Sequence, residues 1–291
     1  MSLSSQKTTG GPSAWDRVLL ARHPERPHTL DYIKYLFTDF TELHGDRKFR
    51  DDPAIVGGLA RFRGRTVLVM GHQKGKDTKE SVRRNWGMPH PEGYRKSIRL
   101  MQQAEKFGFP LITFVDTPAA DPGLQSEERG QAVAIAENLL AMNSLKTISV
   151  AVVTGEGGSG GALALCVADR ILMMENAVYS VASPEASATI LWRDASKAPE
   201  AAAALRLTAR DLQQFGVIDE IISEVGEGAH VEAERSMERV GKAIEQNLKE
   251  LEAEYFSGAG LDVRRLLDAR HRKYYAIGRW VDSAGNASNC P

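Results

Sequence analysis

The stretch TGEGGSGGALAL (residues 154–165) directly follows the apolar run TISVAVV (residues 147–153). An apolar run, a cluster of glycines and then small residues at helical spacing predict a strand, a turn and a helix in that order. The five glycines within residues 154–161 leave backbone N–H groups uncovered, and the dipole of a following helix favours negative charge at its first turn. The stretch therefore predicts an α/β fold with an anionic group, or one that becomes anionic, bound at this turn.

The glycines are open to more than one interpretation. In the simplest one they serve only close packing between the strand and the helix. A phosphate loop would need a Lys-Ser or Lys-Thr pair after the glycines, and none follows. A dinucleotide fingerprint would lie nearer the start of a repeated strand-helix unit. The pattern thus disfavours both nucleotide-binding motifs and leaves the packing interpretation open.

Two catalytic interpretations of the same glycines also remain. Residues 157–161 spell G-x-S-x-G, the nucleophile elbow of serine hydrolases, with Ser159 at its centre. Candidate acids and a base follow in the chain order that such hydrolases use: Asp169, Asp194, Asp219 and His230. Alternatively Ser159 is only a small residue, and the main-chain amides of Gly160 and Gly161 form an oxyanion hole. That arrangement requires a second group of donors elsewhere in the chain.

A second turn supplies such donors. The apolar run LITFVD (residues 111–116) leads into TPAADPG (residues 117–123), and small apolar residues at helical spacing follow from Ala132. Two prolines and Gly123 bend this turn, so the amides of Ala119 and Ala120 can point away from a strand ladder. Two successive strand-helix units form a right-handed parallel pair whose turns share one edge of the sheet. We therefore expect the two groups of amides to face one another across a cleft.

Length and composition describe a globular protein. The 291 residues, 42% hydrophobic and 26% charged, suffice to bury a full core, and a formal net charge of −1 argues against nucleic acid as the main partner. No apolar segment approaches the roughly 18 residues of a membrane span and no signal peptide is evident, so we expect a cytoplasmic protein without membrane contact. Cys166 and Cys290 have no metal-ligand spacing, so no metal site or disulfide is expected.

The chain before the second turn is expected to contain a leader, a helix and a hairpin. Residues 1–14 are small and polar and predict a flexible leader. From Thr29 apolar residues recur every three to four positions, which predicts an amphipathic helix that ends at Gly45. The runs AIVGGLARF (54–62) and TVLVMGH (66–72) predict a β-hairpin, and a further helix is expected over residues 93–107.

Residues 72–97 form a long polar segment between that hairpin and the helix. It holds seven lysines and arginines, and such segments are often solvated loops. Its length nevertheless favours a functional role, because compact domains contain few long loops without one. A phosphate-bearing substrate would suit several of its cations: Lys74, Lys76, Lys79, Arg83 and Arg84.

Three patterns describe the chain after the glycine turn. Residues 178–195 lead through Pro184 into a helix whose Ile190, Leu191 and Trp192 are expected to be core or interface. Residues 197–222 predict two short helices and a strand, with Thr208 as an N-cap. After His230, apolar residues repeat at helical spacing along a charged segment, which predicts a long helix packed on its own domain or on a neighbouring subunit.

At the level of whole phrases the sequence resembles a known family. The residues that carry the resemblance span 15–230 in order: RPHTLDYIKYLFTDFTELHGDR, DDPAIVGGLARFRGR, GHQKGKDTKE, NWGMPHPEGYRKSIRLMQQAEKFGFPLITFVDTP, GEGGSGGALAL and ENAVYSVASPE. Together they are similar to the alpha subunit of the carboxyltransferase component of bacterial acetyl-CoA carboxylase.

This resemblance implies a crotonase-type α/β fold (ClpP/crotonase-like) built from repeated β-β-α units. It divides the chain into an N-terminal helical segment (15–50), a crotonase-like carboxyltransferase domain (51–230) and a C-terminal helical extension (231–291). It also implies a heterotetramer with two beta subunits, which bear a zinc ribbon and most of the coenzyme A site. Further partners implied are the biotin carboxyl carrier protein and biotin carboxylase, and no metal is expected in this chain.

The activity implied by the resemblance is the transfer of a carboxyl group from carboxybiotin, held on the carrier protein, to acetyl-CoA. The product is malonyl-CoA, which enters fatty acid biosynthesis. Ureido and enolate oxygens gain negative charge during this transfer, and preorganised amides stabilise such charge. The expected catalytic donors are the amides of Gly160 and Gly161 with those of Ala119 and Ala120. Substrate contacts are expected from Gly157, Gly158, Lys74, Lys76, Arg83 and Arg84.

The sequence departs from the family pattern at the second turn. The family usually reads TPGAYPG where this chain has TPAADPG, so Ala119 replaces a glycine and Asp121 replaces a tyrosine. If that glycine has a positive φ, alanine there costs about 1 kcal/mol, and a carboxylate beside an anion site opposes the developing charge. Two alternatives to a fully active transferase therefore stay open: a divergent paralogue or assembly subunit with weakened activity, and a serine hydrolase that uses Ser159.

Overall fold

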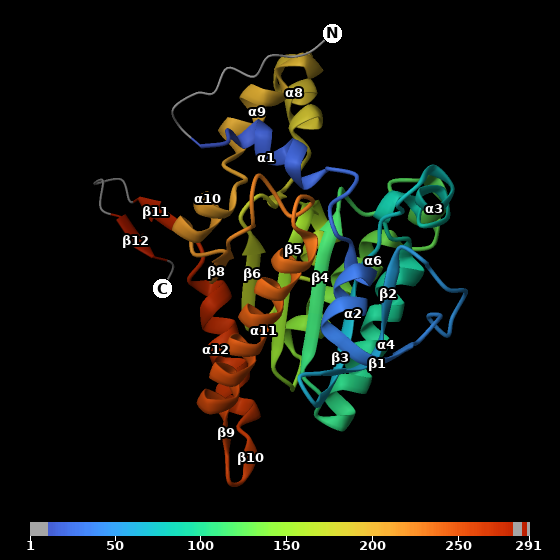
Figure 1. The fold of residues 1–291 in the computed structure, drawn as a ribbon, viewed down its shortest axis with the longest axis vertical. Coiled ribbons are helices and arrows are strands. Elements are labelled where there is room, and N and C mark those ends of the chain that lie inside the picture. The colour runs from blue at the N-terminus through green and yellow to red at the C-terminus, as the bar shows by residue number, and fades with distance from the viewer. Residues whose placement is uncertain (1–10, 282–286, 290–291) are drawn as a thin grey trace.

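One mixed β-sheet forms the centre of the computed structural model, which describes residues 11–281 and 287–289 (Figure 1). In the described residues the strands follow the order β1-β2-β3-β4-β5-β6-β8, and β7 pairs with the end of β5. Their bounds are β1 Phe37–Glu42, β2 Ile55–Phe62, β3 Arg65–His72, β4 Leu111–Thr117, β5 Ser149–Gly158, β6 Arg170–Met174, β7 Val178–Ser180 and β8 Glu220–Ile222. The first three strands are antiparallel, and those from β3 to β8 are parallel to their neighbours.

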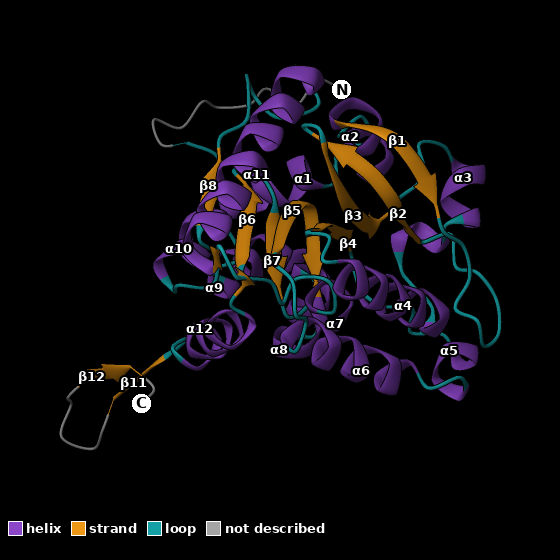
Figure 2. Cartoon of the chain, turned by 90° about the horizontal axis from the view of Figure 1, so that it is seen from below, coloured by secondary structure: helices purple, strands orange, loops and turns teal. Residues whose placement is uncertain are grey.

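Helices cover both faces of the sheet (Figure 2). Helices α4 (Pro91–Phe107) and α6 (Gln131–Asn143) pack on one face, with α12 (Val263–Tyr275) beside α6. On the other face lie α2 (Thr29–Leu36) and α11 (Ala233–Tyr255). The strands between these layers are apolar and fully buried, as expected for parallel strands covered on both sides. The result is a three-layer α/β arrangement.

A small helical cluster lies at one end of the sheet, where α1 (Ala14–Ala21) contacts α9 (Ala198–Leu205), and α9 packs on α8 (Pro184–Trp192). Several short elements complete the described chain: α3 Thr78–Arg83, η1 Asn85–Gly87, α5 Leu124–Glu128, α7 Ser159–Leu163, η2 Ala195–Lys197 and α10 Ala209–Gln214. Two small hairpins follow, β9 Phe256–Ser257 with β10 Gly260–Leu261 and β11 Arg279–Val281 with β12 Ala287–Asn289.

The helix expected from Thr29 to Gly45 was wrong in its second half. Helix α2 ends at Leu36, and the next residues form strand β1 along the edge of β2. Phe37 packs against Phe62 of β2, with ring centroids 5.1 Å apart and the rings tilted by 40°. Residues 37–42 therefore obtain both backbone pairing and an aromatic contact from the sheet, which overrides the helical spacing of their apolar residues. The segment 15–50 is thus only partly helical.

Other expectations for the elements are confirmed. The hairpin of β2 and β3, the two short helices α9 and α10, and the N-cap by the Thr208 side chain are all present. The long helix α11 buries one apolar stripe against its own sheet, through Met237, Val240, Ile244, Leu248, Leu251 and Tyr255. By contrast Ile190 and Leu191 on α8 are exposed, so they are not core. The expected leader falls mostly on residues outside the described part.

Candidate functional site

The two turns singled out by the sequence lie side by side at the carboxyl edge of the sheet. Strands β4 and β5 are parallel neighbours, and Thr117 at the end of β4 pairs with Gly157 near the end of β5. The strand β5 extends to Gly158, five residues further than its apolar run. Helix α7 then begins at Ser159 and is only five residues long. The strand, turn and helix are therefore present, with the glycines divided between strand and helix.

The two turns touch one another and are not separated by a cleft. A Cβ atom added to Gly158 would lie 1.8 Å from the carbonyl oxygen of Pro118, and one added to Gly161 would lie 2.5 Å from the nitrogen of Ala120. Only glycine permits such an approach of two main chains. Gly158 and Gly161 are thus required by packing, and the expectation of a cleft between the turns was wrong. A Cβ at Gly160 would meet only the methyl groups of Ile135, at 3.6 and 3.8 Å.

Some amides at this contact donate a hydrogen bond to an acceptor, and others have no acceptor. Ala119 N–H donates to Thr117 Oγ1 at 3.2 Å. For the amides of Ala120, Gly160 and Gly161, no hydrogen bond to another described residue is found. Gly161 is buried, whereas Gly160 and Ala120 are half-buried. Three of the four predicted donors therefore have no acceptor in the described fold, and their role as an oxyanion site stays a prediction.

Ser159 has the backbone of a nucleophile elbow but not its surroundings. Its φ is +52°, it is exposed, and its hydroxyl makes no hydrogen bond to another described residue. The ring of His230 stacks on the ring of His23, with centroids 3.8 Å apart. His72 is buried, and its Nε2 lies 3.2 Å from the Gly161 carbonyl oxygen. Each candidate acid has another partner, namely Arg270 for Asp169, Ser196 for Asp194 and Lys273 for Asp219. The described residues therefore give Ser159 no base, which argues against the hydrolase alternative.

The cations of the polar segment divide into two groups. Lys74 Nζ lies 2.7 Å from Asp116 Oδ1 and 2.8 Å from Glu156 Oε2. Arg84 is buried and bonds to Glu80 and to the Pro53 carbonyl. Lys76 and Arg83 keep side chains that are 62% and 63% exposed. The first two cations are neutralised inside the fold, whereas Lys76, Arg83 and the exposed Lys79 stay open to a substrate phosphate. That role stays a prediction for all three.

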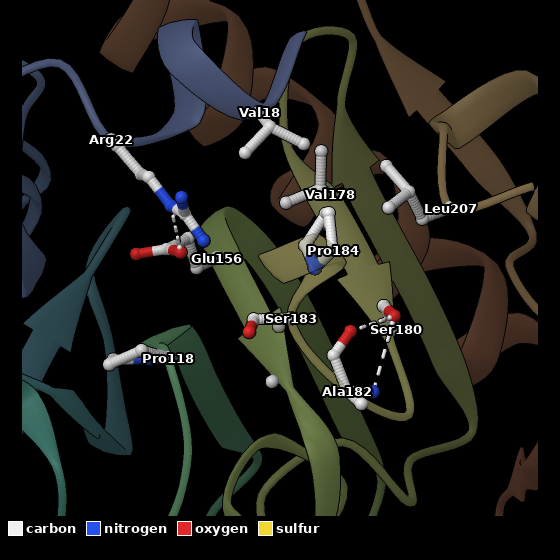
Figure 3. A pocket seen from close by; sticks show the side chains of 12 residues that line it. Val18, Arg22, Pro118, Glu156, Val178, Ser180, Ala182, Ser183, Pro184 and Leu207 are labelled. Atoms are coloured by element: carbon white, nitrogen blue, oxygen red, sulfur yellow. Dashed lines mark hydrogen bonds and ion pairs between the residues drawn. The ribbon is translucent and has the colours of Figure 1, made fainter. Parts of the chain in front are cut away.

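A buried charge network underlies the glycine turn. Besides Lys74, Glu156 binds Arg22, the residue that follows α1, whose Nε lies 2.6 Å from Glu156 Oε1 (Figure 3). Arg22 also binds Glu185 at the start of α8, 2.5 Å from NH1 to Oε1. Burial acts to raise the pKa of Glu156, but Lys74 and Arg22 outweigh it and hold this pKa below its usual value. Glu156 therefore stays ionised and ties α1 and α8 to the end of β5.

The network also lines two hollows beside the turns. One contains Arg22, Glu156, Gly157, Gly158 and apolar residues such as Val18 and Pro184 (Figure 3). The other, of about 450 Å³, is bounded by Lys74, Lys76, Trp86 and Pro118 and shares Arg22 and Glu156 with the first. The expected substrate contacts Gly157 and Gly158 thus line a hollow at the sheet edge.

The family departures at the second turn have little effect on the backbone. Ala119 does not adopt a positive φ, so the predicted cost of alanine there does not apply. The Asp121 carboxylate accepts from Asn85 Nδ2 at 2.9 Å and from the Gly123 amide at 3.1 Å, beside His90 Nδ1 at 3.3 Å. Burial acts to raise the pKa of Asp121, but these and other hydrogen bonds lower it. Asp121 is therefore ionised and links its turn to residues 85–90.

Sequence reasoning missed the acidic members of the site. Asp116 ends the apolar run of residues 111–116, and Glu156 lies among the glycines three residues after the apolar run of residues 147–153, which is the signal that was available. Their partners Arg22 and His28 come from a segment about 90 to 130 residues earlier, and no local pattern connects them. Among the described residues, no group of three or more His, Cys, Asp or Glu side chains is arranged to hold a metal ion. No described helix has the length and apolar character to cross a membrane.

Comparisons with known proteins agree with the resemblance of the sequence phrases. A sequence model of the family described as acetyl co-enzyme A carboxylase carboxyltransferase-like matches residues 4–278. The acetyl-coenzyme A carboxylase carboxyl transferase subunit alpha of Anoxybacillus flavithermus is 55% identical over 276 residues, which cover 95% of this chain and 83% of the relative. The subunit of the same name from Bacillus cytotoxicus is 55% identical over 270 residues, covering 93% and 81%.

Solved structures give the same fold at lower identity. Transcarboxylase 12S, with methylmalonyl-coenzyme A bound, has a TM-score of 0.59 and 22% identity, and the match covers 73% of this chain and 41% of that one. The hetero-dimer of Pseudomonas malonate decarboxylase has a TM-score of 0.59 and 17% identity, covering 77% and 90%. The expectation of a crotonase-type α/β fold is confirmed.

Proposed function

The chain belongs to the acetyl-CoA carboxylase carboxyltransferase family as an alpha subunit, and on this basis we propose which of its groups carry the transfer. The amides of Gly160, Gly161 and Ala120 would donate to the oxygen that gains negative charge, with Ala119 holding the shape of the second turn. The observation that carries this proposal is the contact of two turns whose amides at Ala120, Gly160 and Gly161 have no acceptor in the described fold.

The proposed chemistry needs no protein nucleophile. Carboxybiotin, presented by the carrier protein, releases carbon dioxide, and the nitrogen of its ureido group then takes a proton from the methyl group of acetyl-CoA. The resulting enolate carbon bonds to carbon dioxide and gives malonyl-CoA. Negative charge develops on the ureido oxygen and on the enolate oxygen, and one aligned amide donor lowers such a barrier by about 3–4 kcal/mol. We propose that this chain stabilises the ureido oxygen.

We propose further that the chain acts in a complex. Its expected partners are a beta carboxyltransferase subunit with a zinc ribbon, the biotin carboxyl carrier protein and biotin carboxylase. The name of the relatives, which are subunits of a carboxyltransferase, supports a multisubunit assembly. Exposed apolar side chains on α8, Ile190 and Leu191, also suit a surface covered in a complex. A cytoplasmic location, metal-free chemistry in this chain and the docking geometry stay predictions.

Reconstitution tests the proposal. The chain is mixed with its beta subunit, and carboxylation of free biotin by malonyl-CoA is followed as the reverse reaction. In Gly160→Val the added γ-carbons crowd the amides of Gly160 and Gly161, so activity should fall about 100-fold. The matched control Ser159→Ala removes the hydroxyl next door and should keep activity within threefold. Full activity in Gly160→Val would contradict the amide site, and loss in Ser159→Ala would restore a role for the hydroxyl.

The same assay separates an active subunit from a decayed one. If the chain only assembles with its partner, the wild-type complex will form but will not carboxylate biotin. Asp121→Tyr, which restores the family residue, would then raise the rate. We expect the wild-type complex to be active, because Ala119 has an unstrained backbone and Asp121 has partners of its own.

A further inference from the structure

Lys74 and Asp116 form a buried pair directly beneath the two turns. Lys74 follows β3, and Asp116 lies on β4 one residue before Thr117, with side chains that are 16% and 2% exposed. One carboxylate oxygen of Asp116 lies 2.7 Å from Lys74 Nζ, and the other lies 3.2 Å from His28 Nδ1. Both oxygens of Asp116 are therefore engaged although the residue is out of reach of water.

Asp116 also holds an irregularity in the strand ladder. The pairing of β4 with β5 is regular up to Val115 with Val153 and resumes at Thr117 with Gly157. One residue on β4 thus faces three residues on β5, numbers 154–156. Asp116 Oδ1 accepts the N–H of Glu156 at 3.0 Å and so replaces the lost ladder partner. Such bulges re-aim the strand that follows them.

The bulge closes tightly around the carboxylate. A Cβ atom added to Gly155 would lie 2.3 Å from Asp116 Oδ1, so only glycine allows the strand to approach it. Beyond the bulge, Gly158 meets Pro118 and Gly161 meets Ala120. The distance between the two turns is therefore set where β5 passes over Asp116.

Two opposing effects decide the charge of Asp116. Burial acts to raise its pKa, and Lys74 together with His28 lowers the pKa far below the usual value. Burial likewise acts to lower the pKa of Lys74, but Asp116 and Glu156 raise it. Asp116 and Lys74 therefore help to keep each other ionised despite their burial, with support from His28 and Glu156.

We propose that Lys74 and Asp116 are positioning residues for the amide site: the ionised Asp116 holds the bulge of β5, and Lys74 keeps Asp116 ionised. Lys74 thus acts through the main chain and does not bind substrate phosphate, contrary to the expectation from its basic surroundings. This role rests on the proposed function of the amides of Gly160, Gly161 and Ala120.

Three variants test the role in the reconstituted complex with the beta subunit. Lys74→Met keeps the length of the side chain and removes its charge, and we expect kcat for biotin carboxylation to fall about 100-fold at pH 7. The KM for malonyl-CoA should change less than twofold, because the resemblance assigns most of the coenzyme A site to the beta subunit. Lys74→Arg restores the cation and should recover at least about a third of the wild-type kcat.

The pH profile separates positioning from a general loss of structure. Without Lys74, burial raises the pKa of Asp116. The kcat of Lys74→Met should therefore increase with pH as this carboxyl ionises, whereas the kcat of wild type should show no such increase. This increase of kcat with pH should be absent in the double variant Lys74→Met/Asp116→Asn. Other charged or titratable groups that face Asp116 remain present in all variants: His28, Glu156, Arg26, Tyr32 and His72.

Two results would overturn the positioning role. One is a kcat of Lys74→Met within threefold of wild type, and the other is a reduced kcat with the same pH profile as wild type. The variant Gly160→Val, measured beside them, shows which idea has failed. If Gly160→Val is inactive and Lys74→Met is active, only the positioning role falls. If Gly160→Val is fully active, the amide site itself is wrong.

Discussion

The predictions for the glycine turn and for the basic segment agree with the folded structure to different extents. The turn at residues 157–161 keeps the main-chain donors that its sequence suggested, because backbone amides follow directly from the end of a strand. The basic segment loses half of its four predicted substrate contacts, since Lys74 and Arg84 turn inward to carboxylates and carbonyls. The comparison indicates that main-chain sites can be inferred from local sequence, whereas the use of a side-chain charge depends on partners distant in the chain.

The largest effect is expected from a change that separates the two turns. In Gly158→Ala the new methyl group would lie 1.8 Å from the Pro118 carbonyl oxygen, so the main chains must move apart. Overpacking of this kind costs about 1–3 kcal/mol of unfolding free energy, and misplacing the amides should lower kcat about 1000-fold. Urea unfolding and the biotin carboxylation assay measure the two effects.

Gly160→Ala is the control for this change. Its methyl group meets only Ile135 at ordinary contact distances, so its unfolding free energy should stay close to wild type. Equal destabilisation of the two variants would mean that the glycines serve helix packing in general. There would then be no difference between Gly158, which the contact of the turns requires, and Gly160, which leaves the amides accessible to a ligand.

The same contrast explains what the sequence could predict. The hairpin of β2 and β3, the strand-turn-helix at residues 149–163 and its neighbour on β4 follow from periodicity and glycines. The end of α2 at Leu36 does not, because the edge of β2 decides it. The network of Arg22, Glu156 and Glu185 was also out of reach, since three segments must fold before its charges meet.

A buried cation far from the turns should affect stability alone. Arg270 of α12 binds Asp169 through Nε at 2.8 Å and NH2 at 3.0 Å, and it donates to carbonyls between Met142 and Thr147. In Arg270→Met the carboxylate of Asp169 stays buried without its cation, so the unfolding free energy should fall by about 3–5 kcal/mol. Denaturation followed by circular dichroism measures the loss.

The kcat of the folded Arg270→Met complex provides the matching comparison with Lys74. We expect it to remain within twofold of wild type at a temperature where the variant is folded, because Arg270 touches neither turn. A kcat as low as that of Lys74→Met would mean that any lost buried charge disturbs the site. The positioning role proposed for Lys74 would then be refuted.

Acid should destabilise the protein through His72, which lies beneath the glycine turn. Burial lowers the pKa of His72 to about 4, against 6.5 for the ordinary side chain. The unfolded chain therefore binds a proton more readily, and the stability contribution of neutral His72 is complete above pH 6.5 and is lost as the pH falls toward 4. The difference between the two pKa values corresponds to about 3 kcal/mol of unfolding free energy. Urea unfolding at several pH values measures it.

His72→Gln identifies the residue responsible for that pH dependence. Glutamine can still donate to the Gly161 carbonyl but does not titrate, so the fall in stability between pH 6.5 and 4 should be about 3 kcal/mol smaller than in wild type. An identical fall in both proteins would mean that the imidazole is not held neutral. Other groups would then account for the fall, because carboxylates with lowered pKa values, such as Glu156, lose their contribution only below their ordinary pKa of 4.5.

The smallest effect is expected from the exposed cations of the basic segment. Lys76 pairs with Asp31 and Arg83 lies 3.8 Å from Glu80, and both side chains remain mostly in solvent. Such surface pairs contribute about 0–1 kcal/mol, so Lys76→Ala and Arg83→Ala should unfold almost as wild type does. If either cation meets a substrate phosphate, its loss should raise the KM for malonyl-CoA about three- to tenfold and leave kcat unchanged. An unchanged KM for malonyl-CoA in the double variant would show that neither Lys76 nor Arg83 contacts a substrate phosphate.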